Sequence, residues 1–462
     1  MPRPLRALVV ALLACPAFAA PPPPAPTDWA FDVLHLKSGV VHKGLILDEG
    51  EAGVRFRIVR RAPGRPTVWL TCAFGRGEYE RLEKLTPEAR AELKAKLAEI
   101  DPAAEGRRLE KLDLKPAAWL GKESAALRYD SDYFTLVSDA PEEIVRRAAD
   151  RLENVYAAYA RYLPPRLDSG TPTIIHVHQT LDGYRTALPV GANFRNPAFF
   201  EPGANRVVCG TDLQKLGDDL ARARVQAKQA LDELSKQEAE VRRLYGKKPE
   251  LERHLLPVAE NRGRIRQAGR ANEAAFDRAT QQLFRVLYHE AFHAYVGSFV
   301  FPHAAKDGPA RPGELPRWLN EGMAQVFETA VFEAGELRVG HADRERLTAT
   351  TDALAGKGLT PIAELLAAGP TAFAVVHSGR RPDSDRAYVT AWAVASYLMF
   401  DRHVVGTATL DAFVTAVNAG TDPVRAFETF VGQPAAEFEK ALHLWLKRLR
   451  PDGSLLEVGK EK

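Results

Sequence analysis

Apolar side chains recur with a period of seven through the middle of the chain. One series runs from Leu213 to Val241, and a second follows three positions behind it with a break at Gln237. A heptad pattern over four repeats is typical of a coiled-coil helix, and the glycine, lysines and proline at 246–249 predict a turn. We therefore expect a helical-hairpin insertion at 212–275, outside the catalytic framework. An intramolecular hairpin is favoured, and an interface with a partner or a second copy is the alternative.

Shorter apolar runs with a period near two dominate the N-terminal part. Turn signals such as Ser38-Gly39 and Glu49-Gly50 separate them. Alternation bounded by such turns predicts short strands, so we expect a small β-barrel at 28–85 that resembles SH3-like or Sm-like modules. A helical linker at 86–115 should follow, with a helix over 87–100 and a charged stretch after it. The expected strands lie at 31–36, 40–47, 54–59 and 68–74.

The pattern from 116 to 450 predicts an α+β domain. Strands come first and helices later, which suits a small mixed sheet with a helical C-terminal part. A hairpin is expected around Pro202-Gly203-Ala204-Asn205, between strands at 198–201 and 206–209. The other expected strands lie at 133–138, 173–177 and 335–339, and the other expected helices at 141–162, 387–400 and within 410–449.

Two helices of this domain carry candidate chemistry. In the first, apolar residues recur at threes and fours from Phe276 to Leu287, and two histidines four residues apart follow, His289 and His293. Positions four apart lie on one helix face, so both imidazoles can bind one zinc ion. Glu290 is then placed to act as general base toward water. The alternative is a buried helix whose histidines only satisfy their neighbours.

The second helix begins near Pro316 and buries a stripe that includes Leu319 and Met323. Glu321 lies off this stripe, beside Asn320. A carboxylate at this position can be the third protein ligand of a zinc ion and leave the fourth position for water.

The sequence HEAFH at 289–293, followed by WLNEG at 318–322, resembles the gluzincin metallopeptidases, specifically bacterial families with a peptidase-MA-like domain. The resemblance covers residues 128–450 and implies a zincin-like catalytic domain with one zinc ion per chain. The residues that it implies for the site are His289, His293 and Glu321 as ligands and Glu290 as general base.

Thermolysin-like members of this family read N-E-x-x-S-D, and the aspartate orients a ligand histidine. Here Asn320 precedes Glu321, and Gln325 stands at the place of that aspartate. A glutamine oxygen accepts a hydrogen bond from imidazole more weakly than a carboxylate does. Asn320 and Gln325 are therefore the expected partners of the ligand histidines.

The resemblance also implies a substrate-binding strand and a group that stabilises the oxyanion. In the family, an edge strand beside the metal helix holds the substrate backbone by strand addition, and an ordinary sheet edge is the alternative here. For the oxyanion, Tyr388 is preferred over His341 and His377, and a core tyrosine is the alternative. The candidate residues of the strand are Arg206, Val207, Val208 and Cys209.

Composition changes this picture little. The 462 residues are 45% hydrophobic and 27% charged, which is ordinary for globular domains. The net charge of +3 is too near balance to indicate a nucleic-acid partner or an anionic membrane. The absence of a C-x-x-C motif excludes a cysteine-based zinc site, and Cys72 and Cys209 are expected to be unpaired, buried thiols. A solvated face, rather than RNA binding, is expected for the arginine cluster of Arg55, Arg57, Arg60, Arg61 and Arg65.

Residues 1–20 have the features of a signal peptide, with Arg3 and Arg6 before an apolar core and a cleavage box at 17–19. Lipid anchoring through Cys15 is the alternative, and a proline-rich linker at 21–27 follows. No later apolar run is long enough to cross a membrane. We therefore expect an exported protein that is periplasmic, on the cell surface or extracellular.

These features together predict an exported zinc-dependent peptidase that acts on a peptide or protein substrate. One alternative is a zinc-retaining but catalytically idle binding protein, in which the barrel and the hairpin carry the function. The other is a zinc hydrolase with a non-peptide substrate. The intact Glu290 argues against the first alternative, and no sequence feature argues strongly against the second.

Overall fold

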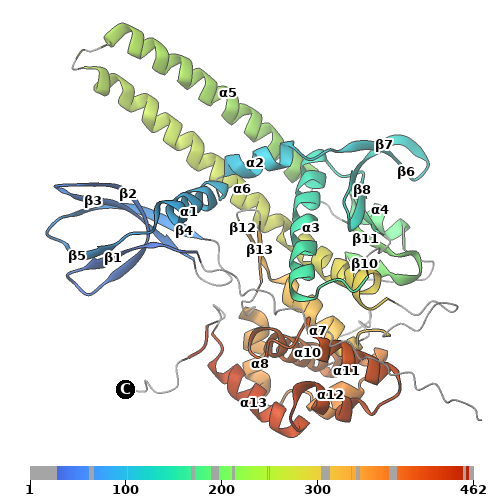
Figure 1. The fold of residues 1–462 in the computed structure, drawn as a ribbon. Coiled ribbons are helices and arrows are strands. Elements are labelled where there is room, and N and C mark those ends of the chain that lie inside the picture. Colours follow the sequence, from blue (N-terminus) through green and yellow to red (C-terminus); the bar gives the residue numbers. More distant parts are fainter. Residues whose placement is uncertain are drawn as a thin grey trace, which may run out of the picture.

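The computed structural model has the expected mixed α+β class, with an N-terminal antiparallel sheet and a helical C-terminal part (Figure 1). The predicted signal peptide with Cys15, the proline-rich linker, Arg65, His341 and His377 lie outside the described residues. The residues that the structure describes are 29–61, 67–100, 102–167, 172–188, 197–210, 214–246, 248, 250–302, 313–333, 336–339, 344–356, 358–373, 382–450 and 454–456.

The first sheet has five antiparallel strands in the order β4-β3-β2-β1-β5. Its two faces pack into separate apolar clusters, one around Leu34 and Phe56 and the other around Trp29, Leu45 and Val59. Alternating burial of this kind is what the sequence predicts, and a fifth strand follows the four expected ones. The strands are β1 (Asp32–Leu36), β2 (Val41–Gly50), β3 (Gly53–Arg60), β4 (Val68–Gly75) and β5 (Tyr79–Glu83).

Two helices lead from this sheet to the next domain. The predicted helix α1 (Pro87–Glu99) covers the second cluster. The stretch after it is not only a charged linker, because it contains α2 (Pro102–Glu110). Ala104 and Leu109 are each 2% exposed, and α2 packs against α3 (Glu142–Tyr162). Tertiary burial therefore stabilises a helix that the charged sequence does not predict.

The second sheet is mixed, with the strand order β10-β11-β9-β8-β7-β6. Strands β11, β9 and β8 run parallel to one another, and the pairs β10–β11, β7–β8 and β6–β7 are antiparallel. The predicted hairpin is present and turns through Asn205, whose φ is 44°. Strands β6 and β7 were not predicted. The strands are β6 (Lys115–Trp119), β7 (Lys122–Asp130), β8 (Phe134–Ser138), β9 (Thr173–His178), β10 (Ala198–Glu201) and β11 (Arg206–Gly210).

Strand β11 is not an edge of this sheet. It pairs with β10 on one side and with β9 on the other, so the expectation of a free edge at Arg206, Val207, Val208 and Cys209 is wrong. The chain passes through the edge position first, as β10, and then turns back into the place beside β9. The edge strand next to the helix that carries His289 and His293 is therefore β10.

An antiparallel helical hairpin, the arm, projects from this domain as predicted (Figure 1). It consists of α5 (Gln214–Tyr245) and the first part of α6 (Leu251–Tyr295). Leu220 and Leu234 are buried in the seam, whereas Leu244, beyond the break at Gln237, is 54% exposed. Helix α6 is continuous through HEAFH, so a single helix forms both a limb of the arm and the metal-site helix.

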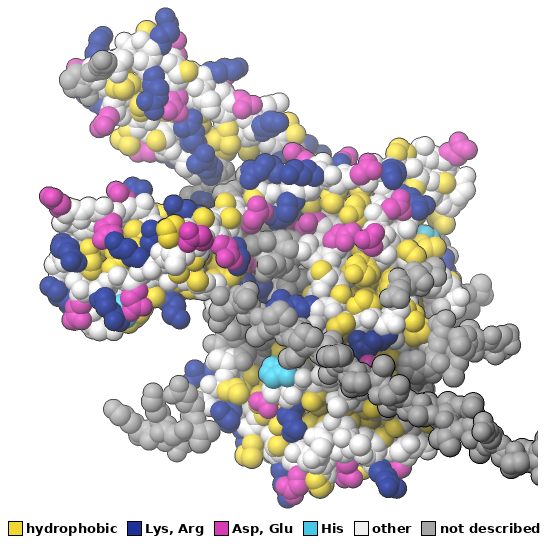
Figure 2. Space-filling model, viewed as in Figure 1, with side chains coloured by type: hydrophobic (Ala, Val, Ile, Leu, Met, Phe, Trp, Pro, Cys, Tyr) yellow, Lys and Arg dark blue, Asp and Glu magenta, His cyan; other side chains and the backbone are white. Residues whose placement is uncertain are grey.

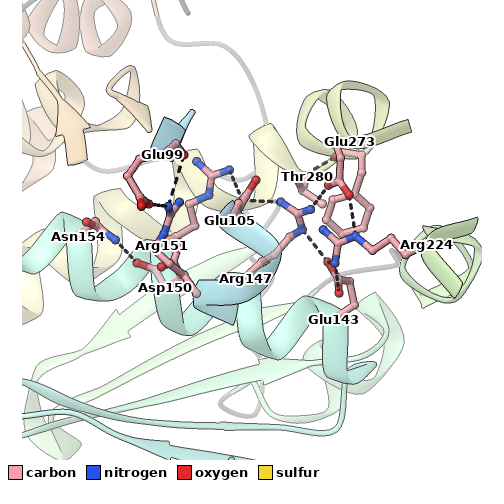
Figure 3. A network of polar contacts seen from close by, with 12 residues as sticks. Glu99, Glu105, Glu143, Arg147, Asp150, Arg151, Asn154, Arg224, Glu273 and Thr280 are labelled. Atoms are coloured by element: carbon pink, nitrogen blue, oxygen red, sulfur yellow. Dashed lines mark hydrogen bonds and ion pairs between the residues drawn. The ribbon is translucent and has the colours of Figure 1, made fainter. Parts of the chain in front are cut away.

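Buried ion pairs join the base of the arm to the domain (Figure 3). Arg147 on α3 is fully buried and contacts Glu105 on α2 at 2.9 Å, Glu143 at 2.9 Å, and Glu273 on α6. Arg224 on α5 pairs with Glu143 at 2.8 Å and with Glu273 at 2.6 Å. Two arginines, from α3 and α5, thus neutralise carboxylates from α2, α3 and α6, and the lower part of the arm is fixed to the domain.

Two buried tyrosines hold α6 against α3 on either side of the histidines. Tyr159 donates a hydrogen bond to the carbonyl of Tyr288 at 2.5 Å, and Tyr295 donates to the carbonyl of Leu163 at 2.7 Å. Both hydroxyls use backbone acceptors in the core, where an unmade hydrogen bond would be costly. The metal-site segment of α6 is therefore fixed in depth and rotation.

The C-terminal part is a group of packed helices below α6 (Figure 1). Among the described residues, no helix has an apolar stretch long enough to cross a lipid bilayer. A short hairpin, β12 (Val331–Glu333) and β13 (Glu336–Arg338), agrees with part of the expected strand at 335–339, of which Gly335 lies outside the described residues. The helices are α7 (Arg317–Glu328), α8 (Arg344–Ala355), α9 (Ile362–Ala367), α10 (Pro382–Phe400), α11 (Ala408–Asn418), α12 (Pro423–Val431) and α13 (Ala435–Arg448).

The surface carries both signs of charge. On the face in Figure 2, Lys and Arg side chains are interspersed with Asp and Glu over the arm and the first sheet. Arg55 and Arg60 are exposed, while Arg61 lies over the ring of Trp29 at 4.3 Å. This mixture favours the solvated-face interpretation of the arginine cluster. Cys72 and Cys209 are free thiols, as predicted, but only Cys209 is buried, because Cys72 lies half-buried on β4.

Candidate metal centre

The structure brings the three predicted ligands together. His289 and His293 lie one turn apart on α6 and face Glu321 on α7. His289 Nε2 is 3.2 Å from Glu321 Oε2, and His293 Nε2 is 3.6 Å from Glu321 Oε1. One ligand atom from each residue lies within 4.8 Å of the others. Within the described part of the chain, these residues form a group that could hold a metal ion.

Glu321 reaches the histidines because α7 packs closely against α10. A Cβ atom at Gly322 would lie 2.3 Å from the carbonyl oxygen of Ala391, so only glycine permits this approach. In the first turn of α7, the buried ring of Trp318 packs edge-on against Phe427. These contacts fix α7 on both sides of Glu321, whose side chain is 2% exposed.

Each histidine is oriented through its other ring nitrogen. His293 Nδ1 lies 3.0 Å from Asn320 Oδ1, which confirms the predicted role of Asn320. His289 Nδ1 lies 2.5 Å from Glu328 Oε1, and Arg346 holds the second oxygen of Glu328 at 2.6 Å. Acceptors at both Nδ1 atoms fix the tautomers that leave Nε2 free to bind a metal.

The expectation for Gln325 is wrong. Its amide nitrogen donates to the backbone carbonyls of Glu321 at 3.2 Å and Tyr388 at 3.1 Å, so it links α7 to α10 instead of orienting a histidine. The carboxylate that orients a ligand histidine comes instead from Glu328, which contacts His289 and lies seven residues after Glu321 on the same helix face. That spacing is visible in the sequence and could have identified Glu328.

The donor set fits a metal ion. Glu321 Oε2 is buried and accepts no hydrogen bond from the described residues, although it lies 3.2 Å from His289 Nε2. A buried carboxylate oxygen without a hydrogen bond is costly unless a cation compensates it. Two imidazole nitrogens and one carboxylate oxygen, each oriented by an outer partner, can supply that cation with three ligands.

The charges of the site act strongly on one another. Burial alone would raise the pKa of Glu321, but His293, His289 and Arg317 lower it to about 2. Burial lowers the pKa of His293 to about 4. Burial also acts to lower the pKa of His289, but Glu321 and Glu328 outweigh it and hold this pKa well above its ordinary value.

Glu290 faces the edge strand. Its Oε2 accepts a hydrogen bond from the backbone N–H of Phe200 on β10 at 2.8 Å. Burial raises the pKa of Glu290 to about 7, although His289 acts to lower it. A carboxyl group with a pKa near neutrality can both accept and return a proton. The structure thus places a potential base between the histidine helix and the strand β10.

Tyr388 lies near the site, but its hydroxyl has another partner. It donates a hydrogen bond to the carbonyl of Phe373 at 2.7 Å, and its ring packs edge-on against the ring of Phe373. Burial, reinforced by the charge of Glu321, raises the pKa of Tyr388. This arrangement favours the core interpretation of Tyr388 over the oxyanion role.

Arg317 is a further member of the site that the sequence interpretation missed. Its Nη2 lies 2.6 Å from Glu321 Oε1, one helical turn away. The signal was its position four residues before Glu321, which places both side chains on one face of α7.

Comparison with protein families finds one described as "Protein of unknown function (DUF1570)", which matches residues 288–416. The match covers less than half of the chain and includes both HEAFH and WLNEG. Comparisons with curated proteins and with solved structures gave no match. The matched region therefore contains the histidine-bearing end of α6, α7 and α10, and its description names no activity.

Proposed function

We propose that this protein is a zinc-dependent peptidase of the gluzincin type. The observation that carries the proposal is the convergence of His289, His293 and Glu321, with Glu290 beside them at the edge strand. Two histidines and a glutamate are a ligand set typical of zinc hydrolases, in which a fourth position remains for water. When bound, a zinc ion supplies Lewis acidity, which polarises a carbonyl group and acidifies water.

Glu290 is the proposed general base. It takes a proton from the attacking water while the water oxygen bonds to the carbonyl carbon and the C=O electron pair moves onto oxygen. When the carbon–nitrogen bond breaks, Glu290 returns the proton to the leaving nitrogen. The second water proton stays on the added oxygen, so the products are a carboxylic acid, which then ionises in solution, and an amine, and Glu290 regains its starting state.

The position of β10 supports a peptide substrate over a non-peptide one. This strand lies at the edge of the sheet, and the N–H of Phe200 points at Glu290. Backbone groups on the open side of an edge strand can pair with an extended peptide by strand addition. We accordingly assign substrate binding to β10 in place of the originally expected Arg206–Cys209 segment.

The proposal extends to the remaining parts of the chain. Strand β5 pairs with β1 in the first sheet, and this order is compatible with an SH3-like module. The mixed sheet with α6 and α7 is compatible with a zincin-like catalytic domain. Residues 1–20 are proposed to direct export, and the arm is proposed to contact a partner.

Zinc analysis and peptide digestion of matched variants test this function. The wild type should hold one zinc ion per chain, and His293→Ala should lose it. The control His443→Ala, on α13, should keep it. Glu290→Gln should keep zinc and thermal stability, because its amide is nearly isosteric. Its peptide hydrolysis should fall by about 10²–10⁴-fold or more, since an amide cannot accept the proton.

Two results would contradict the proposal. Equal zinc content in wild type and His293→Ala would remove the metal assignment. A zinc-loaded wild type that cleaves nothing in a broad peptide library would remove the peptidase assignment and favour an idle binding protein or another hydrolase.

A further inference from the structure

The proposed reaction requires a donor for developing negative charge. Attack on an amide carbonyl places a full charge on its oxygen, and donors aimed at this oxygen are among the largest contributors to catalysis. Tyr388 was the expected donor, but its hydroxyl group donates a hydrogen bond to the carbonyl oxygen of Phe373, 2.7 Å from the hydroxyl oxygen. Another group near the ligands must therefore be considered.

Arg317 lies beside the candidate ligands. It is the first residue of α7, and its Nη2 lies 2.6 Å from Glu321 Oε1. The Arg317 side chain is 48% exposed, whereas those of Glu321, His293 and His289 are 2%, 10% and 16% exposed. The guanidinium therefore reaches the ligands from the accessible side, where a substrate must enter.

The charge of Arg317 acts on the whole site. It lowers the pKa of Glu290 and His293 as well as that of Glu321, so it lies within electrostatic range of the base and of two ligands. A guanidinium carries five N–H donors in a planar fork, and contact with one oxygen of Glu321 does not exhaust them. Its high pKa also keeps it charged throughout the working range of a peptidase.

We propose that Arg317 is a catalytic residue whose guanidinium donates hydrogen bonds to the oxygen that becomes negative in the tetrahedral intermediate. This inference rests on the proposed peptidase function. The water proton goes to Glu290, the C=O electron pair moves onto oxygen, and Arg317 keeps all its protons. When that pair reforms the carbonyl, the carbon–nitrogen bond breaks and the nitrogen takes the proton from Glu290.

A different role for Arg317 would be to orient Glu321 alone. The two roles predict different effects on metal affinity. Loss of a side chain that orients a ligand typically lowers metal affinity by about 10–100-fold. Loss of an oxyanion donor should leave metal affinity unchanged, or raise it because a cation near the metal position is removed, while kcat falls by about 10²–10³-fold.

The experiment uses the full chain with wild type, Arg317→Met, Arg317→Lys and Tyr388→Phe. Zinc affinity, kcat and KM on a cleaved peptide, and the affinity of a phosphinic peptide that mimics the tetrahedral anion are measured. Arg317→Met should keep zinc affinity and KM and lose kcat and phosphinic-peptide affinity in parallel. Arg317→Lys should recover part of both, because it restores the charge without the fork, and Tyr388→Phe should keep most of kcat.

Each other outcome overturns a specific statement. An unchanged kcat in zinc-loaded Arg317→Met overturns the inference and leaves the peptidase proposal intact. A kcat loss that disappears at saturating zinc also overturns it, in favour of orienting Glu321. A wild type that binds zinc but cleaves no peptide overturns the proposed function itself, and the inference with it.

Discussion

The carboxylate of Glu328 bridges His289 and Arg346. Its Oε1 lies 2.5 Å from His289 Nδ1, and its Oε2 lies 2.6 Å from Arg346 Nη2. This chain of contacts ties the metal helix to both α7 and α8. It also explains how the site dispenses with a carboxylate at Gln325. The carboxylate that contacts His289 comes from Glu328, which lies on the same helix face two turns after Glu321.

Glu328→Gln is expected to weaken metal binding. The amide is a poorer acceptor for the imidazole N–H, so His289 becomes a weaker and less well-oriented ligand. Metal affinity should fall by about 10–100-fold. Titration calorimetry with zinc measures this directly.

Glu333→Gln is the matched control for Glu328→Gln. Glu333 is also buried and contacts Arg338 at 2.9 Å and Thr67 Oγ1 at 2.7 Å, away from the histidines. It should lower thermal stability without changing zinc affinity. An equal loss of zinc affinity in both variants would mean that zinc affinity depends on any buried carboxylate of this region and not on the contact of Glu328 with His289.

Gly322→Ala should displace α7. Its Cβ would lie 2.3 Å from the backbone oxygen of Ala391, and neither backbone can yield without moving a helix. We expect a destabilisation of about 1–3 kcal/mol together with weaker metal binding, because Glu321 is the neighbouring residue. Urea unfolding and zinc titration provide the two measurements.

Gly263→Ala is the control for Gly322→Ala. A Cβ at Gly263 on α6 meets no atom within 4 Å, so alanine should stabilise this exposed helix by about 0.5–1 kcal/mol. If the two glycine variants behave alike, the close approach of α7 and α10 does not position Glu321.

The arm should be divisible into a dispensable tip and an essential base. Deleting 231–267 and closing the gap with a short turn retains Arg224, Glu273 and the buried seam below them. This variant should keep its zinc affinity and its thermal midpoint, because the removed helices contact mainly each other. Loss of zinc binding in a soluble deletion protein would show that the tip supports the site.

Arg224→Leu should damage the base of the arm in the intact chain. It leaves Glu143 and Glu273 with Arg147 as their remaining arginine partner in this network, and we expect a loss of about 1–3 kcal/mol in unfolding free energy. Arg222→Leu is the control, because Arg222 lies nearby on α5 with a side chain 64% exposed and pairs with Asp219. A similar loss in both variants would contradict a special role for the buried network.

Asp150 provides a pH-dependent test of burial on α3. Burial raises the pKa of Asp150 above its ordinary value, although Arg108 and Arg151 act to lower it. A carboxyl group with a raised folded-state pKa contributes stability at low pH, and this contribution is lost as the pH rises through the folded-state pKa. Asp150→Asn should therefore raise the thermal midpoint relative to wild type more at pH 7 than at pH 4.

The control for this comparison is Asp182→Asn, since the Asp182 side chain is 91% exposed. The difference between this variant and wild type should change little between the two pH values. An Asp150→Asn effect that is the same at pH 4 and pH 7 would show that the carboxyl group is not destabilised by burial.

The sequence by itself determined the elements with strong periodicity. The heptad repeat predicted the helical hairpin of the arm. The apolar residues spaced three and four apart before His289 predicted the helix that carries the histidines, and the i, i+4 spacing placed both histidines on one face of it. These features are local, and helix geometry alone relates their residues.

Only the tertiary structure decided which strand is the edge and which groups complete the site. The order β10-β11-β9 depends on where a hairpin inserts into a sheet, and no local pattern separates β10 from β11. Glu328 meets His289, and Tyr388 donates to Phe373, because α7, α8 and α10 pack at particular depths. Such contacts depend on residues far apart in the chain, which a periodicity of two or 3.6 cannot encode.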